Sequence, residues 1–290
     1  MQASKSVGIL TTVDEMRAAA RASRQRSKTL GFIPTMGALH EGHLSLIRSA
    51  GAKCDAVVVS IFVNPLQFGP NEDFFRYPRP FEKDLALLEQ ESVDFVFAPS
   101  PEEMYPAGAV TCVEVKRLSE KLCGRSRQGH FRGVTTIVSK LFNIIQPNLA
   151  FFGQKDAAQV AIIRRMVKDL NIPVEIVVCP IVREPDGLAM SSRNAYLSEE
   201  QRKSALVLSA ALRHMEEAFE NGERSSKTLL SAGVRIFEQE PAAKLDYLEI
   251  IDPDTLDDVN QLSKPALVAV AAFIGTTRLI DNVLLRPKGL

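Results

Sequence analysis

The sequence has no excess of charge of either sign, and this balance narrows the possible binding partners. Its 290 residues hold 35 Lys and Arg against 35 Asp and Glu, so the formal net charge is zero. A non-specific nucleic-acid binder needs a basic excess or a basic stripe to neutralise phosphates. We therefore expect no nucleic-acid partner. The 46% hydrophobic and 24% charged residues are ordinary for a globular chain and exclude disorder.

Cysteine pairs and membrane-length apolar runs are also missing. The four cysteines lie far apart, and three adjoin or sit in apolar segments, which predicts buried free thiols rather than a disulfide framework or a zinc site. The longest run without charge, residues 56–71, is too short to span a membrane. Residues 1–8 lack the apolar stretch of a secretory signal. These absences predict a cytoplasmic protein with no membrane partner.

Short apolar runs alternate with stretches of helical periodicity up to about residue 187. Residues 56–63, AVVVSIFV, are apolar on every side, as expected for a strand of a parallel sheet covered on both faces. Strands are predicted at 30–34, 56–63, 93–98, 149–152 and 174–182, and helices at 12–26, 40–54, 81–91, 131–145 and 157–170. This βαβ repetition predicts a Rossmann-like α/β domain with a parallel sheet, residues 1–187.

The pattern changes after about residue 188. Two consecutive helices are predicted at 198–221 and 225–238, followed by strands at 244–250, 266–273 and 277–285. Helices followed by strands, without alternation, are typical of an α+β domain. We therefore expect a smaller C-terminal domain, residues 188–290.

The clearest chemical signal joins a predicted core strand to a helix. It is the segment Thr35-Met36-Gly37-Ala38-Leu39-His40-Glu41-Gly42-His43. In an open α/β sheet this position faces the ligand crevice. His40 and His43 would share one helix face, about 5–6 Å apart, at a helix N-terminus that favours phosphate. Two imidazole donors there would stabilise charge that develops on a phosphorus atom under attack. A surface pair or a metal-binding pair of histidines is the alternative interpretation.

Two further segments carry groups that suit a nucleotide. Gly153-Gln154-Lys155-Asp156 follows a predicted strand; Lys155 offers a mobile positive charge for phosphate, and Asp156 an acceptor for ribose hydroxyls or a helix cap. Met190-Ser191-Ser192-Arg193 offers hydroxyls and a guanidinium for phosphates. Taken alone, the first segment is also compatible with a capped strand–helix turn and the second with a Ser-rich linker.

Together these segments resemble one family. Residues 40–43 match the HxGH signature of the nucleotidyltransferase superfamily, which class I aminoacyl-tRNA synthetases share. Residues 190–193 resemble a variant of the KMSKS loop of those synthetases. The chain also contains, in order, Asn64-Pro65-Leu66-Gln67-Phe68 with Tyr77-Pro78-Arg79, Gly129-His130-Phe131-Arg132-Gly133-Val134, Phe152-Gly153-Gln154-Lys155-Asp156 with Gln159, Pro180-Ile181-Val182-Arg183 and Ser191-Ser192-Arg193-Asn194. Over essentially its whole length, the chain resembles the pantoate–β-alanine ligases.

The resemblance implies a reaction and a set of site residues. The reaction is the ATP-dependent joining of (R)-pantoate to β-alanine through pantoyl adenylate, with release of AMP and pyrophosphate. The catalytic residues implied are His43, His40 and Lys155. The ATP-binding residues implied are Met36, Gly37, Ala38, Leu39, His40, Glu41, Gly42, His43, Gly153, Gln154, Lys155, Asp156, Val182, Met190, Ser191, Ser192 and Arg193. Gln67 and Gln159 are implied to bind pantoate, and Gln67 also β-alanine.

The pair of glutamines suits pantoate because a neutral amide both donates to and accepts from its hydroxyls. Without the resemblance, the expected interpretation of Gln67 and Gln159 is that both are solvated side chains. The resemblance further implies a homodimer, a C-terminal domain that closes as a lid, and Mg²⁺ bound largely through the ATP phosphates. No metal-binding residue is predicted, because the sequence shows no compact cluster of carboxylates.

Some features depart from the family pattern or stay open. Ala158 stands where many members have a second glutamine, and Gln128 stands where proline is usual. The basic loop 125–132, with Arg125, Arg127, His130 and Arg132, either closes on phosphates or is a solvated surface.

Two other functions are weaker alternatives. Another HxGH adenylyltransferase needs extra basic residues around Gln67 and Gln159 to bind a phosphate acceptor, and the sequence lacks them. An RNA-binding protein derived from a class I synthetase needs a basic appended domain, which the zero net charge argues against.

Overall fold

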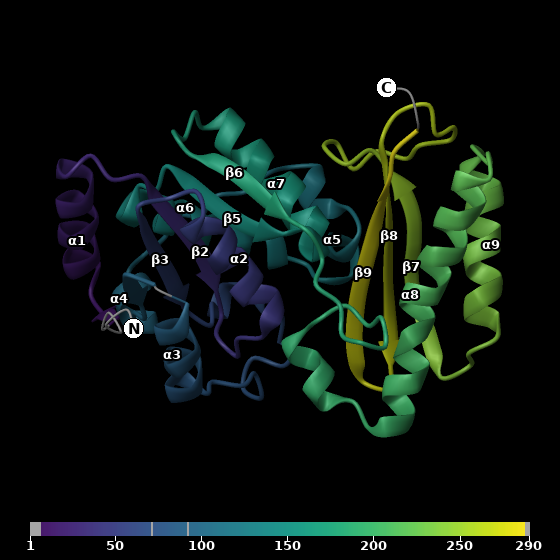
Figure 1. The fold of residues 1–290 in the computed structure, drawn as a ribbon, viewed down its shortest axis with the longest axis horizontal. Coiled ribbons are helices and arrows are strands. Elements are labelled where there is room, and N and C mark those ends of the chain that lie inside the picture. Colours follow the sequence, from purple (N-terminus) through teal and green to yellow (C-terminus); the bar gives the residue numbers. More distant parts are fainter. Residues whose placement is uncertain (1–6, 71, 92, 288–290) are drawn as a thin grey trace. The chain divides into compact units, whose positions relative to one another are not determined.

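The computed structural model describes residues 7–70, 72–91 and 93–287, and they form two compact units (Figure 1). The first unit is built from Met1–Glu120, Gly124–Gly153 and Ile162–Cys179, and the second from Lys121–Cys123, Gln154–Ala161 and Pro180–Leu290. Of the N-terminal residues on which the absence of a secretory signal was predicted, 1–6 lie outside the described part.

A six-stranded sheet is the scaffold of the first unit. Its strands are β1 (Gly8–Leu10), β2 (Leu30–Thr35), β3 (Ala56–Ile61), β4 (Phe95–Phe97), β5 (Leu149–Gly153) and β6 (Glu175–Cys179). Their spatial order is β1-β4-β3-β2-β5-β6, and every neighbouring pair is parallel. The strand order reverses between β2 and β5, and open α/β sheets bind ligands at such a point, beyond the carboxyl ends of the strands. The predicted Rossmann-like fold is confirmed.

Helices cover both faces of this sheet. The longer helices that follow its strands are α1 (Val13–Gln25), α2 (Glu41–Gly51), α3 (Phe81–Gln90), α6 (His130–Ile145) and α7 (Ala157–Asp169), and the short ones are α4 (Pro101–Met104), α5 (Cys123–Ser126) and η2 (Leu118–Glu120). Ile33 of β2 belongs to a buried cluster with Ile47 of α2. Its neighbour Phe32 packs against Phe142 of α6, with ring centroids 6.4 Å apart. Because successive side chains of a strand point to opposite faces, α2 and α6 lie on opposite sides of the sheet.

The second unit has the predicted α+β character. Its elements are α8 (Glu199–Glu220), α9 (Ser226–Glu238) and the strands β7 (Ala243–Ile251), β8 (Ala266–Ile274) and β9 (Thr277–Leu285). The strands form an antiparallel sheet in the order β7-β8-β9, and Figure 1 shows α8 and α9 alongside it. Both helices contact strands of the sheet and share one apolar core with them. The central strand β8 is almost wholly buried, which explains its continuous apolar sequence.

Some details differ from the sequence predictions. The strand predicted at 174–182 ends at Cys179, because Pro180 has no N–H to donate to a sheet ladder. All four cysteines are free, yet only Cys123 and Cys179 are buried, while Cys54 is half-buried and Cys112 is exposed. The expectation of buried thiols is therefore only partly correct. Among the described residues, no helix combines the length and apolarity needed to cross a membrane.

Candidate active site

The turn between β2 and α2 carries the histidine pair. Gly37 and Ala38 have φ angles of +82° and +50°, so two consecutive residues occupy the left-handed region. A Cβ on Gly37 would lie 3.0 Å from a carboxylate oxygen of Asp84, so both the positive φ and the tight space favour glycine there. Helix α2 then begins at Glu41, with His40 as its N-cap. The predicted strand–turn–helix arrangement is confirmed.

Asp84 of α3 holds this turn in place. Its Oδ2 accepts the N–H of Ala38 and its Oδ1 accepts the N–H of Leu39, both at 2.8 Å. Burial raises the pKa of Asp84 above its ordinary value, against the two amide hydrogen bonds, which lower it. The residue is 1% exposed, so these contacts are sheltered from water. Asp84 therefore fixes the path by which the chain enters α2.

Backbone N–H groups orient both imidazole rings. His40 Nδ1 accepts from Gly42 N at 3.1 Å, and His43 Nδ1 accepts from His40 N at 3.3 Å. A neutral ring that accepts at Nδ1 carries its proton on Nε2, so each ring presents an Nε2–H donor. The ring centroids are 4.1 Å apart. Together with the positive end of the helix dipole, these donors suit the N-terminus of α2 to an anion such as phosphate.

Gln67 ends the short helix η1 (Pro65–Gln67), and its side-chain amide is held at both ends. Its Oε1 accepts from Asn64 Nδ2 at 3.1 Å, and its Nε2 donates to Met36 Sδ at 3.0 Å. The buried Asn64 also accepts from the hydroxyl of Tyr105 at 2.8 Å. Burial raises the pKa of Tyr105, so this hydroxyl remains a donor at neutral pH. The structure thus brings Gln67 together with Met36, one of the predicted ATP residues.

Part of the basic loop, whose role the sequence leaves open, contacts the backbone of the same glutamine. His130 Nδ1 lies 2.8 Å from the carbonyl oxygen of Gln67, and Arg127 Nη1 lies 3.0 Å from His130 Nε2. Arg127 also donates to both carboxylate oxygens of Glu72, at 2.6 and 2.8 Å. Burial alone would raise the pKa of Glu72, but the hydrogen bonds and charge of Arg127 bring it below its ordinary value. Arg127 and His130 therefore support η1 and are not a solvated surface.

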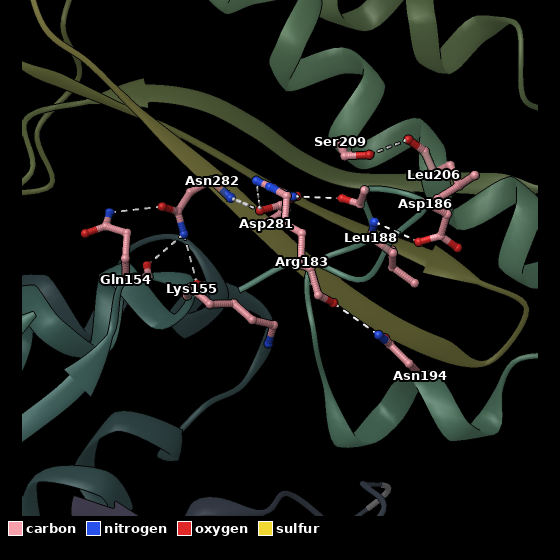
Figure 2. A network of polar contacts seen from close by, with 12 residues as sticks. Gln154, Lys155, Arg183, Asp186, Leu188, Asn194, Leu206, Ser209, Asp281 and Asn282 are labelled. Atoms are coloured by element: carbon pink, nitrogen blue, oxygen red, sulfur yellow. Dashed lines mark hydrogen bonds and ion pairs between the residues drawn. The ribbon is translucent and has the colours of Figure 1, made fainter. Parts of the chain in front are cut away.

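In the second unit, the short helix η3 (Gln154–Asp156) carries three of the predicted ATP residues. It follows β5 directly and leads into α7, whose first turn contains Gln159. The ammonium group of Lys155 has no hydrogen bond or ion pair with the part of the chain that the structure describes. Figure 2 shows its side chain directed away from Asn282 of β9, which contacts the η3 backbone.

The remaining predicted ATP residues come together in a hairpin of the same unit. Met190 N donates to the carbonyl of Val182 at 3.0 Å, which makes these two residues neighbours. Ser191 then caps the short helix η4 (Ser192–Tyr196) and accepts from Arg193 N at 3.3 Å. Asn194 donates two side-chain hydrogen bonds, of 2.7 and 3.1 Å, back to the hairpin. The loop from Met190 to Arg193 is therefore anchored at both ends.

Three residues that hold these segments were not predicted to do so: Asp84, Asn64 and Asn282. Asn64 stands in the motif that contains Gln67, but its contacts depend on the fold. The sequence did contain a signal for Asn282, because Asp281 and Asn282 interrupt the apolar residues of 279–285, LIDNVLL, and buried polar groups need partners. Asp84 had none, since an acidic residue in the first turn of a helix is ordinary.

The fold and the histidine pair together define a class of protein. A doubly wound parallel sheet, with donors at the helix N-terminus that follows its switch-point strand, is typical of nucleotide-binding α/β enzymes. A family model described as pantoate-beta-alanine ligase matches residues 8–284. The chain belongs to the pantoate–β-alanine ligase family, and the reaction of this enzyme is the joining of pantoate to β-alanine.

Relatives and solved structures agree with this assignment. A pantothenate synthetase from Acidobacterium capsulatum is 62% identical over 285 residues, which cover 94% of this chain and 95% of the relative. One from Thermotoga neapolitana is 57% identical, with coverage of 96% and 99%. The crystal structure of pantothenate synthetase from Thermus thermophilus matches with a TM-score of 0.93 at 48% identity, covering 97% of this chain and 100% of that one.

A second similar solved structure contains bound ligands. It is the pantoate-beta-alanine ligase from Francisella tularensis, complexed with beta-gamma ATP and beta-alanine. It matches with a TM-score of 0.79 at 36% identity, covering 96% of this chain and 97% of that one. The predicted family, the predicted fold and the joining of pantoate to β-alanine are therefore confirmed, and membership decides against the two alternative functions.

Proposed function

We propose that this ligase activates pantoate as an acyl adenylate. The observation that carries the proposal is the pair of imidazole rings at the N-terminus of α2, each oriented at Nδ1 so that Nε2–H is a donor. Such donors suit a phosphate group whose negative charge grows during attack. Activation at phosphorus, rather than direct amide formation, is what this arrangement serves.

In the first step, a carboxylate oxygen of pantoate attacks the α-phosphorus of Mg-ATP. The new P–O bond forms as the bond to the β-phosphate oxygen breaks, which gives pantoyl adenylate and pyrophosphate. His40, His43 and Lys155 stabilise the charge that develops on phosphorus. The other ATP contacts are proposed for Met36, Gly37, Ala38, Leu39, Glu41, Gly42, Gly153, Gln154, Asp156, Val182, Met190, Ser191, Ser192 and Arg193.

In the second step, the unprotonated amine of β-alanine attacks the acyl carbon of the adenylate. The C–N bond forms, the bond between the acyl carbon and the phosphate oxygen breaks, and AMP leaves with that oxygen. The amine loses one proton to solvent or buffer. A water-poor site protects the mixed anhydride from hydrolysis in the meantime. Gln67 is proposed to contact β-alanine as well as pantoate.

Mg²⁺ enters as part of the substrate Mg-ATP. The described residues contain no group of three or more His, Cys, Asp or Glu side chains that could hold a metal ion. We expect the phosphate oxygens of ATP to be the main ligands of the metal, because Mg²⁺ prefers oxygen ligands and keeps several waters.

The pantoate subsite is proposed to be formed by Gln67 and Gln159. A neutral amide pairs with the hydroxyls of pantoate without stabilising the carboxylate that must act as the nucleophile. The contacts of Gln67 with Asn64 and Met36 support this assignment, because they fix the direction of its amide. For Gln159 the support is its place in the first turn of α7.

Substitutions of the pantoate residues and of the ATP residue Lys155 should affect different kinetic constants. We expect Gln67→Ala and Gln159→Ala to raise the KM for pantoate by about tenfold, the cost of one or two lost hydrogen bonds, and to leave ATP affinity nearly unchanged. Lys155→Ala should do the reverse, weakening ATP binding or lowering kcat. Isothermal titration with each substrate measures both. If both glutamine variants lost ATP affinity as strongly as Lys155→Ala, separate subsites would be ruled out.

The proposal also covers the roles of the two domains, the location of the enzyme and its oligomeric state. Residues 1–187 serve as the ATP- and pantoate-binding domain, and residues 188–290 as a lid domain. The enzyme acts in the cytoplasm as a homodimer. A mass in solution equal to that of one chain would contradict the dimer.

A further inference from the structure

Strand β9 contains two adjacent buried polar residues, Asp281 and Asn282, between the apolar pair Leu279-Ile280 and the apolar run Val283-Leu284-Leu285. Asp281 and Asn282 are each 3% exposed and pair with Val270 and Ala269 of the central strand β8. Buried polar side chains cost free energy unless their hydrogen bonds are satisfied. Their partners therefore identify what this part of the strand does.

Asn282 makes three side-chain hydrogen bonds, and all of them go to η3 (Figure 2). Its Nδ2 donates to the carbonyl oxygens of Gln154 and Lys155, both at 2.9 Å. Its Oδ1 accepts from Gln154 Nε2 at 3.0 Å. Both amide hydrogens and the carbonyl oxygen of the side chain are thus used on two consecutive residues of one short segment.

The two carbonyls belong to the two peptide groups that flank the Cα atom of Lys155. A peptide group is planar, so a fixed carbonyl oxygen restricts the orientation of the whole group. Fixing both groups restricts the backbone torsions of Lys155, and with them the direction in which its side chain leaves the chain. That side chain is directed away from Asn282 (Figure 2). Asn282 thus acts on the backbone of Lys155 and leaves its ammonium accessible.

Asp281 holds a second ATP segment in the same way. It accepts from the guanidinium of Arg183 at 2.6 and 3.1 Å and from the backbone N–H of Asn282 at 2.8 Å. Arg183 follows Val182, one of the proposed ATP residues. Neighbouring residues of β9 therefore anchor two separate segments assigned to ATP.

We propose that Asn282 is a positioning residue for ATP, which acts by fixing the peptide groups on either side of Lys155. This inference rests on the proposed role of Lys155 at the ATP phosphates. Removal of the Asn282 amide frees both carbonyls of η3, and the ammonium of Lys155 then samples directions that do not reach phosphate. Pantoate binding through Gln67 does not depend on these contacts.

The first test compares Asn282→Ala with a matched control. We expect Asn282→Ala to raise the KM for ATP about tenfold, the equivalent of the hydrogen bonds lost, while the KM for pantoate stays within twofold. The control is Ser226→Ala, which removes a buried side-chain donor bonded to a different backbone carbonyl, that of Val259, in the same unit. It should lower Tm without changing either KM. If Asn282→Ala changed Tm alone, the positioning role would be wrong.

A milder substitution, Asn282→Ser, tests the inference if Asn282→Ala does not fold. Asn282→Ser retains one hydroxyl donor but cannot satisfy both carbonyls. Its KM for ATP should lie between the values for the wild type and for Asn282→Ala, or about threefold above wild type if only the serine variant folds. An unchanged KM for ATP in a folded Asn282→Ser enzyme would overturn the inference.

A double-mutant comparison separates this inference from the function on which it rests. In a Lys155→Ala background, Asn282→Ala should add no more than twofold to the loss of ATP use, because the group being positioned is already gone. If the two losses multiplied instead, Asn282 would act independently of Lys155 and the inference would fail. If Lys155→Ala alone left ATP use intact, the proposed role of Lys155 would fail instead, whatever the effect of Asn282.

Discussion

His43→Ala is expected to slow pantoyl adenylate formation by about 10²–10³ in a single turnover, while the enzyme stays folded. His43 is half-buried at the start of α2, so its removal leaves the core intact. What the variant lacks is the imidazole, whose Nε2–H is a donor because Nδ1 accepts a backbone hydrogen bond. That donor acts mainly on charge present in the transition state, so the rate should fall far more than ATP affinity.

Two further variants of His43 test whether the donor at Nε2 is the group that matters. Glutamine places its amide nitrogen near the position of Nε2, whereas asparagine places its amide near Nδ1. His43→Gln should recover part of the lost rate, and His43→Asn should resemble His43→Ala. A rate for His43→Ala within threefold of wild type would remove His43 from the chemistry.

Gly133→Ala is expected to have the second largest effect, on both stability and pantoate binding. A Cβ at Gly133 of α6 would lie 2.2 Å from the carbonyl oxygen of Leu66 and 2.6 Å from the backbone nitrogen of Gln67. These are backbone atoms of η1, so relief of the clash must shift the segment that carries Gln67. Overpacking of this kind costs typically about 1–3 kcal/mol of unfolding free energy. The KM for pantoate should also rise by about tenfold or more.

Thermal unfolding and pantoate kinetics measure the two parts of this effect. Gly51→Ala is the matched control, because a Cβ there meets no heavy atom within 4 Å. It should leave both properties unchanged or raise stability slightly, since alanine favours a helix over glycine. If Gly133→Ala bound pantoate as well as Gly51→Ala does, the close packing of α6 on η1 would not govern the position of Gln67.

Local signals in the sequence predicted most of the fold. Thr12 followed three residues later by Glu15 is the sequence pattern of a capping box at a helix N-terminus, and the structure has this capping box at the start of α1. Thr277–Leu285 has the predicted strand bounds because its apolar residues and the preceding Gly275 are local features. The three-residue edge strand β1 was missed, since so short a segment has no periodicity to detect.

The site was only partly predictable, for a physical reason. The residues from Met36 to His43 form one continuous segment, so their order alone indicates a turn and a helix N-terminus. Asp84 contacts this segment from 45 and 46 residues away, and Asn282 contacts η3 from 127 and 128 residues away. Contacts at such separations are set by strand order and helix packing, which no local pattern contains.

The central claim, activation of pantoate as an adenylate, is tested most directly by the nucleotide product of a single turnover without β-alanine. Enzyme with Mg-ATP and pantoate alone should release a burst of pyrophosphate of about one equivalent per active site and retain the adenylate. Addition of β-alanine should then release AMP and pantothenate, faster as pH rises toward the amine pKa of roughly 10. Chromatography separates AMP from ADP. Formation of ADP and phosphate would mean an acyl phosphate intermediate and would contradict the account.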